Sequence, residues 1–300
     1  FYESIKSEIN REIGKIVEKN KNKKMDREFP DINVLINLEN FSISINPRSL
    51  FIFGKYKKIA RGIPQATWYC QRCKGKGCEY CKGKGLLYPT SVQMIIEKPL
   101  LKVLKGKKSK IHAEGREDID VRCLGWRPFV IEVVKPKIRK INLKKVTREI
   151  NRSKKVKVTG LRIIKDAKRI IRFIKTEKSE KTYLAIVYFE DKIDKDKLKE
   201  IKKLENSIIL QKTPLRIIHR RSDKLRQKKV KEISYSILNK KTLKLKITTS
   251  AGLYVKEFIT GDESRTRPSI AEILNNKPKK VLLDVIKIHS KVEEILKWKC

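Results

Sequence analysis

The sequence predicts an α+β protein built on a mixed, largely antiparallel sheet. Runs with strand character dominate from residue 91 onward, and those at 231–238 and 243–249 flank a short polar stretch, as the two strands of a hairpin do. Helical patterns are fewer and do not alternate regularly with the strands, which disfavours a doubly wound parallel sheet. Hydrophobic residues make up 39% of the chain, enough to form a sizeable core.

Residues 1–66 predict a small α+β unit. Isoleucine and valine recur at helical spacing in residues 3–18, with charged residues between them. Three strand-like runs follow, at 32–36, 41–45 and 50–53. A packing role and an RNA-binding role fit this unit equally well. Because the chain opens with Phe1 rather than Met, we expect its native start to lie upstream.

Residues 67–90 and 91–300 differ in composition. The first segment is rich in Gly, Lys and Cys and has too few apolar residues for a core, which is typical of a knuckle. The second has the strand and helix patterns of a full domain. Further strands are expected at 129–134, 183–189, 207–210 and 281–289. Helices are expected at 194–205 and 267–276.

The chain carries a formal net charge of +41, from 75 Lys and Arg against 34 Asp and Glu. Such a charge is typical of a protein that binds a polyanion, and nucleic acid releases counterions when it is bound. An anionic membrane and a Lys-rich codon bias are the alternatives, but no apolar run approaches the about 20 residues of a membrane span, and no signal peptide opens the chain. We therefore expect a cytoplasmic nucleic-acid-binding protein. The strongly basic segment 139–181 fits a solvated face or a track along a phosphate backbone.

Four of the six cysteines form two CxxC pairs, and each pair is followed by Lys-Gly-Lys-Gly. A CxxC pair can bring two thiolates onto one metal ion, and clustered thiols of this kind indicate a reducing compartment. Zn²⁺ in a Cys₄ tetrahedron is the leading interpretation, with an iron–sulfur cluster as the alternative. Because four thiolates fill the coordination sphere, we expect a structural metal that presents lysines to RNA. The expected ligands are Cys70, Cys73, Cys78 and Cys81.

Carboxylates and one lysine are the remaining candidates for chemistry, because the three histidines are far apart and do not suit a Ser-His-Asp triad. The stretch 115–122 holds three carboxylates among two arginines. Such a stretch is most often a salt-bridged turn, yet a carboxylate flanked by arginines stays ionised, which suits a nucleophile or a base. Tyr183 heads an alternating strand, where tyrosine usually packs. Lys256 follows a Gly that marks a close backbone approach, and it could face an acid.

These pieces resemble, in the same order along the chain, the archaeal and eukaryotic tRNA pseudouridine(54/55) synthases. The stretch 115–129 is similar to that family's active-site segment, whose Gly-Arg-x-Asp type loop carries the one essential carboxylate. The similarity includes the cysteine pairs and runs from about Asp31 to Ile288. It is also carried by the segments 54–65, 211–230 and 250–270. The resemblance implies the pseudouridine synthase fold, a mixed sheet with an active-site cleft across its middle, preceded by the last third of a THUMP-type RNA-binding region.

The resemblance also implies roles for single residues. Asp118 would be the catalytic nucleophile or base, and Lys256 would be its basic partner. Tyr183 would stack on the target base and help to remove the proton on carbon 5, and Leu283 would pack beneath that base. The residues expected to contact the substrate are Tyr183, Leu283, Arg61, Arg116, His219, Arg220 and Arg221. The expected substrate is the T arm of tRNA, modified at uridine 54, uridine 55 or both, and no cofactor is expected for catalysis.

Two other functions stay open at this point. A non-catalytic zinc-containing RNA-binding protein fits the composition, the knuckle and the basic segment. An RNA methyltransferase is weakened because no Gly-rich cofactor loop follows a strand. Asp118, Tyr183 and Lys256 discriminate between these functions: convergence in one basic cleft favours the synthase, whereas scattered positions favour the binding module.

Overall fold

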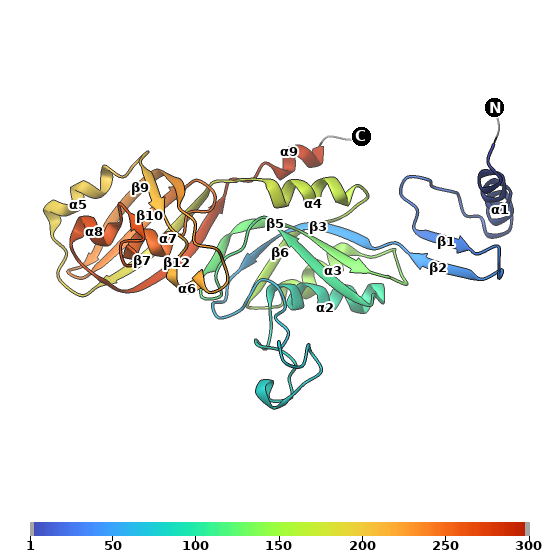
Figure 1. Ribbon diagram of the computed structural model, residues 1–300, viewed down its shortest axis with the longest axis horizontal. Helices are drawn as coiled ribbons and strands as arrows, with labels where there is room; N and C mark the ends of the chain where they lie inside the picture. Colours follow the sequence, from blue (N-terminus) through green and yellow to red (C-terminus); the bar gives the residue numbers. More distant parts are fainter. Residues whose placement is uncertain (1–2, 298–300) are drawn as a thin grey trace.

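The computed structural model describes residues 3–297, an elongated molecule with a small N-terminal unit at one end (Figure 1). This unit consists of α1 (Ile5–Lys21) and the antiparallel pair β1 (Ile32–Ile36) and β2 (Ile43–Pro47). Ser4 caps α1, its hydroxyl accepting a hydrogen bond from the backbone N–H of Ser7. The predicted helix and the first two predicted strands are confirmed.

One ten-stranded sheet organises the rest of the chain. Its order is β11-β8-β9-β10-β7-β12-β5-β3-β6, and β4 pairs with β5 beside this path. Among the strand pairs of the described residues only β12 with β5 is parallel, so the predicted mixed, largely antiparallel sheet is confirmed. The strands are β3 (Leu50–Lys58), β4 (Lys108–Ala113), β5 (Arg122–Val134), β6 (Val156–Ile164), β7 (Lys181–Phe189), β8 (Ile208–Gln211), β9 (Arg226–Asn239), β10 (Thr242–Thr249), β11 (Thr266–Arg267) and β12 (Pro278–Ile288).

Helices pack on both faces of the half of the sheet that contains β3, β5 and β6 (Figure 1). Successive residues of a strand point to opposite faces. Ile52 therefore packs with α2 (Val92–Leu104) and α3 (Leu143–Asn151), whereas Phe53 packs on the other face with α4 (Ala167–Thr176) and α9 (Val292–Lys297).

The half formed by β7, β9, β10 and β12 has a core of its own. It is shared with α5 (Lys195–Lys202), α7 (Val255–Thr260) and α8 (Ile270–Leu274). Two short elements complete the description: a 3₁₀ turn, Glu79–Cys81, in the knuckle, and α6 (Leu215–Ile218). The knuckle projects from the body of the molecule (Figure 1).

Two expectations differ from the structure. The N-terminal unit was expected to reach residue 66, but β3 pairs with β5 and β6 inside the large sheet, so the unit ends before Leu50. The reason is that β3 buries side chains along most of its length, which an isolated small unit could not cover. The basic segment 139–181 contains α3, β6 and α4 rather than one solvated face. Its two helices each bury an apolar stripe, formed by Val146, Ile150, Ala167, Ile170 and Ile174.

The two halves of the sheet meet where β5 runs parallel to β12, with Arg122 opposite Asp284 and Cys123 opposite Val285. Gly125 follows on β5, where the two backbones come close. A Cβ atom at this position would lie 2.9 Å from the Cα of Lys287 and 3.0 Å from the carbonyl oxygen of Ile286. Only glycine permits this approach, because a backbone cannot move aside as a flexible side chain can.

We expect Gly125→Ala to destabilise the fold by about 1–3 kcal/mol, because the added methyl group separates β5 from β12. Thermal and urea unfolding measure the loss. Gly14→Ala in α1 is the matched control, since the new Cβ would meet only the terminal methyl of Met25, and it should leave stability unchanged or slightly raised. Equal stability of wild type and Gly125→Ala would contradict the role given to this junction.

Candidate active site and metal centre

A cleft with a volume of about 700 Å³ lies across the junction of the two halves of the sheet. Asp118 enters it from the loop between β4 and β5, and Lys256 enters from α7. Tyr183 of β7 and Leu283 of β12 form part of its wall. The four residues expected at the reaction centre therefore lie in one cleft, although they come from four separate elements.

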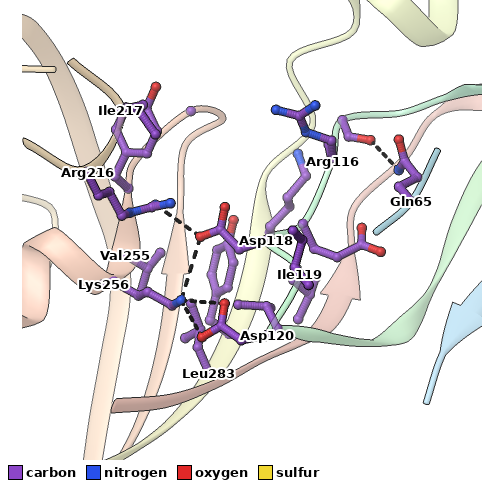
Figure 2. A pocket seen from close by; sticks show the side chains of 18 of the residues that line it. Gln65, Arg116, Asp118, Ile119, Asp120, Arg216, Ile217, Val255, Lys256 and Leu283 are labelled. Atoms are coloured by element: carbon purple, nitrogen blue, oxygen red, sulfur yellow. Dashed lines mark hydrogen bonds and ion pairs between the residues drawn. The ribbon is translucent and has the colours of Figure 1, made fainter. Parts of the chain in front are cut away.

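Asp118 lies between two cations (Figure 2). Its Oδ2 atom is 3.0 Å from Nη2 of Arg216 and 3.8 Å from Nζ of Lys256. The shorter contacts of Lys256 are with Asp120, whose two carboxylate oxygens accept hydrogen bonds at 2.7 and 2.6 Å. The Asp118 side chain keeps 38% of its surface exposed, so its carboxylate is open to the cleft.

The cations that hold Asp118 are not the two arginines next to it in the sequence. Arg122 pairs with Asp284 at 2.5 Å, and Arg116 lines the cleft apart from Asp118 (Figure 2). Arg216, on α6, was not predicted to act at the site. The available signal was its position as the one charged residue in a short apolar helical stretch directly after Pro214.

A buried ionic cluster lies beneath the loop that carries Asp118. Glu117 points inward and its side chain is fully buried. Nε of Arg127 lies 3.1 Å from its carboxylate, Nζ of Lys58 lies 3.9 Å away, and the Tyr56 hydroxyl donates to both of its oxygens at 3.2 Å. Burial lowers the pKa of Lys58, and the neighbouring Glu117 opposes that shift. A buried charge is stable only when it is paired, so these four groups depend on one another.

Lys58 also holds the backbone of the loop directly. Its ammonium group donates to the carbonyl oxygens of Asp118 at 2.9 Å, Ile119 at 3.1 Å and Ile63 at 3.0 Å. On the other side, the amide of Gln65 donates to the carbonyl oxygen of Gly115 at 3.0 Å (Figure 2). The loop is therefore fixed before and after the catalytic candidate.

Tyr183 and Leu283 provide part of the apolar surface of the cleft. Burial raises the pKa of Tyr183 to about 12, so its hydroxyl is neutral at physiological pH. Leu283 is 5% exposed and belongs to the core of its half of the sheet. A flat aromatic ring and an aliphatic side chain in one basic cleft suit a planar base.

The expected RNA contacts have different positions. Arg116, Arg220 and Arg221 line the cleft, and Arg221 donates to the hydroxyl of Tyr254 at 2.9 Å. His219 is exposed at the end of α6 and does not line the cleft. Arg61 does not line it either: its guanidinium donates to the carbonyl oxygens of Asp120 and Leu283, both at 2.7 Å, and therefore ties the loop to β12.

The two CxxC pairs bring their sulfur atoms together, and all four lie within 4.8 Å of one another. The Sγ–Sγ distances are 3.8 Å for Cys70 with Cys78, 3.8 Å for Cys73 with Cys81, and 3.7 Å for Cys78 with Cys81. Zn–S bonds of about 2.3 Å in a tetrahedron require edges of about 3.8 Å. Backbone N–H groups of Gly77, Cys78 and Gly85 point at the sulfurs, as thiolates require. The four predicted cysteines therefore form a cluster that could hold one tetrahedral metal ion.

Comparison with known proteins identifies the family. The family model "Pus10, C-terminal" matches residues 51–289, and "Pus10 THUMP domain, archaeal" matches residues 1–37. The chain belongs to the Pus10 family. The resemblance seen in the sequence, including its THUMP part, is therefore confirmed.

Relatives named "tRNA pseudouridine synthase Pus10" match most of this chain. The protein of Methanocaldococcus jannaschii is 47% identical over 88% of this chain and 58% of its own length. That of Methanococcus voltae is 44% identical over 88% of this chain and 52% of its own. That of Archaeoglobus fulgidus is 38% identical over 95% of this chain and 79% of its own. The chain thus spans a little over half the length of the first two Pus10 relatives.

Solved structures match the Pus10 chain more distantly. A Cbf5-Nop10-Gar1 complex aligns with a TM-score of 0.40 and 14% identity, over 76% of this chain and 47% of that chain. A pseudouridylate synthase aligns with a TM-score of 0.27 and 16% identity, over 92% of this chain and 87% of that chain. Within residues 3–297, no helix is long and apolar enough to cross a membrane.

We expect Arg127→Met to destabilise the protein by about 3–5 kcal/mol, because it leaves the buried carboxylate of Glu117 without its nearest cation. Urea unfolding measures the loss. Arg122→Met is the matched control: Asp284 keeps its contact with Arg61 at 2.5 Å, and Arg122 is partly exposed, so about 1 kcal/mol or less should be lost. Equal losses in the two variants would contradict the dependence of the site on the buried cluster.

Proposed function

We propose that this protein is a tRNA pseudouridine synthase that modifies uridine 54, uridine 55 or both in the T loop, with Asp118 as its catalytic carboxylate. The single observation that carries the proposal is the convergence of Asp118, Tyr183, Lys256 and Leu283 in one cleft. Membership of the Pus10 family supports the same reaction and a tRNA substrate. A non-catalytic zinc-containing RNA-binding protein would have no need for this convergence.

The reaction begins when the target uridine leaves its stack, at a cost of about a few kcal/mol. Its base then stacks on Tyr183 and packs against Leu283, which brings the sugar to Asp118. The carboxylate acts as nucleophile at carbon 1′ or as base on the ribose, and the bond from N1 to carbon 1′ breaks. The freed uracil rotates, carbon 5 bonds to carbon 1′, and the proton on carbon 5 moves to N1 by way of acceptors in the cleft. In the nucleophile route the ester bond between Asp118 and carbon 1′ breaks as carbon 5 bonds, and in the base route Asp118 returns its proton to the ribose.

The groups around the cleft suit these steps. Asp118 is held by two cations and is open to the cleft, so its carboxylate can reach a sugar that is bound there. Burial raises the pKa of Tyr183 to about 12, so its hydroxyl is protonated at physiological pH. The hydroxyl can therefore accept the proton from carbon 5 only if it donates its own proton at the same time. Lys256 stabilises negative charge near Asp118. These residues complete the isomerisation without a cofactor.

Binding of tRNA depends on cations outside the reaction centre. Arg220 and Arg221 lie on the segment that borders the cleft, and Trp68, at the start of the knuckle, lines it as well. The knuckle therefore stands next to the path of the RNA, with lysines after each CxxC pair. With a net charge of +41, the affinity should fall steeply with salt.

The four cysteines hold Zn²⁺ in this proposal, and the ion has a structural role. A segment as short and polar as 67–90 has little apolar surface to bury, so a metal is needed to fix its conformation. Thiolates that stay available as ligands support a cytoplasmic location, where thiols remain reduced.

We expect Asp118→Asn to lower the rate of pseudouridine formation by on the order of 10⁴-fold or more, because the amide can act neither as nucleophile nor as base. An unmodified tRNA transcript is incubated with each variant, and carbodiimide mapping then locates pseudouridine as a new reverse-transcription stop in the T loop. Asp196→Asn on α5, an equal charge change at a side chain that is 92% exposed, is the control and should retain full activity. Stops that persist with Asp118→Asn would contradict the assignment, whereas salt-sensitive tRNA binding without any stop in the wild type would favour the binding module.

We expect Cys73→Ser to lower the bound metal from about one ion per chain to none, and to lower the melting temperature, because a three-thiolate site binds Zn²⁺ weakly. Elemental analysis of protein purified without added metal measures both the amount and the identity of the ion. Cys123→Ala, which removes a buried thiol outside the cluster, should keep the metal. Iron with visible absorption would contradict zinc and favour an iron–sulfur cluster.

A further inference from the structure

We propose that Arg216 is a positioning residue of the active site. Its guanidinium contacts the carboxylates of both Asp118 and Glu257, and the contact with Glu257 holds it where it orients Asp118. This inference rests on the proposed function, since it concerns the geometry of the proposed catalytic group. It adds a residue on α6 to the set that the family resemblance implied, and it assigns to Glu257 the task of holding that residue in place.

Arg216 is the cation nearest to Asp118 among the described residues. Its Nη2 atom lies 3.0 Å from Oδ2 of Asp118, whereas Nζ of Lys256 lies 3.8 Å from the same oxygen. Lys256 makes its short contacts, 2.7 and 2.6 Å, with Asp120 instead. Within residues 3–297, therefore, Arg216 makes the one ion pair with Asp118 that has hydrogen-bond length, and the shorter contacts of Lys256 are with Asp120.

The other side of the Arg216 guanidinium is bound to Glu257. Nε of Arg216 donates to Oε1 of Glu257 at 2.6 Å. The Glu257 side chain is 5% exposed, and its Oε2 atom is buried without a hydrogen-bond partner. A buried carboxylate that lost its cation would be strongly disfavoured, so Glu257 keeps Arg216 at this position. Although burial opposes the charged form, the hydrogen bond to Glu257 raises the pKa of Arg216, and the guanidinium stays charged.

The segment that carries Arg216 is anchored as well. The backbone N–H of Leu215 donates to Asp262 at 3.1 Å. The guanidinium of Arg265 donates to the carbonyl oxygen of Thr213 at 3.0 Å and to Asp223 at 2.5 Å, so it connects the beginning and the end of the turn around α6. Arg216 thus reaches the cleft from a fixed backbone, which is the condition for orienting another side chain.

Two neighbouring residues of α7 contact different members of the site. Lys256 contacts Asp118 and Asp120 (Figure 2). Glu257 contacts Arg216, whose guanidinium also contacts Asp118. A guanidinium can bridge two carboxylates through separate edges, whereas an ammonium group offers a single point charge. The bridging function therefore requires arginine at position 216.

The test measures single-turnover pseudouridine formation and tRNA affinity separately, with the full chain and an unmodified tRNA transcript. We expect Arg216→Met to lower the rate at saturating protein by about 100-fold, since a misplacement of about 1 Å has that effect, while the Kd for tRNA changes by less than about fivefold. Arg216→Lys should recover only part of the rate. Glu257→Gln should lower the rate in the same direction, because the amide holds Arg216 less firmly. Lys199→Met, an exposed α5 residue that removes the same charge, is the control and should leave both quantities unchanged.

Chemical rescue separates positioning from a general structural defect. Guanidinium chloride in the millimolar range should raise the rate of Arg216→Ala by at least about tenfold, and sodium chloride at equal ionic strength should not. An Arg216→Met rate within about threefold of wild type, or a defect confined to Kd, would overturn this proposal and leave the proposed function intact. A wild type that binds tRNA but forms no pseudouridine would overturn both, because Asp118 would then have no reaction to be positioned for.

Discussion

The site depends on a buried carboxylate, Glu117, which is held between Arg127 and Lys58 directly beneath the loop of Asp118. Neither cation can leave without exposing an unpaired charge to the protein interior, which costs several kcal/mol. Lys58 then uses its remaining donors on the carbonyl oxygens of the same loop. The Glu117 side chain is buried, whereas the side chain of its neighbour Asp118 is partly exposed in the cleft. Because the backbone of the loop is held by Lys58 and the buried Glu117, the position of Asp118 is fixed although its side chain is exposed.

The second constraint is the junction of the two half-sheets. β5 and β12 share only a short parallel ladder, so side chains must strengthen the contact. Asp284, 7% exposed, receives Arg61 from the turn after β3 and Arg122 from the start of β5. Arg61 also binds the backbone of Asp120 and Leu283. The residues that join the halves therefore also fix the floor of the cleft, and this explains why an arginine expected to contact RNA is occupied within the protein.

The sequence predicted the strands better than the helices, for a physical reason. A strand such as β10 alternates apolar and polar residues, and this period is visible in short segments. α3 and α4 have their apolar residues diluted by lysine and arginine, as at Ile170 and Ile174, so charge concealed the helical period. α2 and β4 were not predicted at all. Asp118, Tyr183, Lys256 and Leu283 were predicted through ordered resemblance, and the structure brings them into one cleft. No local pattern alone distinguishes a catalytic carboxylate from a salt-bridged turn.

Contacts between distant segments could not be predicted from the sequence. Arg216 and Asp118 are far apart in the chain. The segment 211–230 holds several arginines, and the sequence does not show which of them forms the ion pair with Asp118. His219 shows the converse: it belongs to the same segment, but it lies exposed at the end of α6 and is not among the residues that line the cleft. Which side chain of a short helix faces a site depends on how the helix is anchored, here by Asp262 and Arg265.

The cationic side chains of the molecule form two groups: those paired with carboxylates in the cleft, and those elsewhere that account for the net charge. At the reaction centre the cations are engaged by carboxylates, as Arg216 is by Asp118 and Glu257, and Lys256 by Asp120. These pairs are close to neutral together, so they add little to the attraction of a polyanion. The large net charge of +41 must then arise from side chains outside the centre, such as those of α4, the knuckle and the Arg220–Arg221 rim. Salt screens exposed charges far more than partly buried pairs. Attraction of a polyanion and orientation of the carboxylate are therefore separable properties of one basic protein, because each relies on cations that the other does not use.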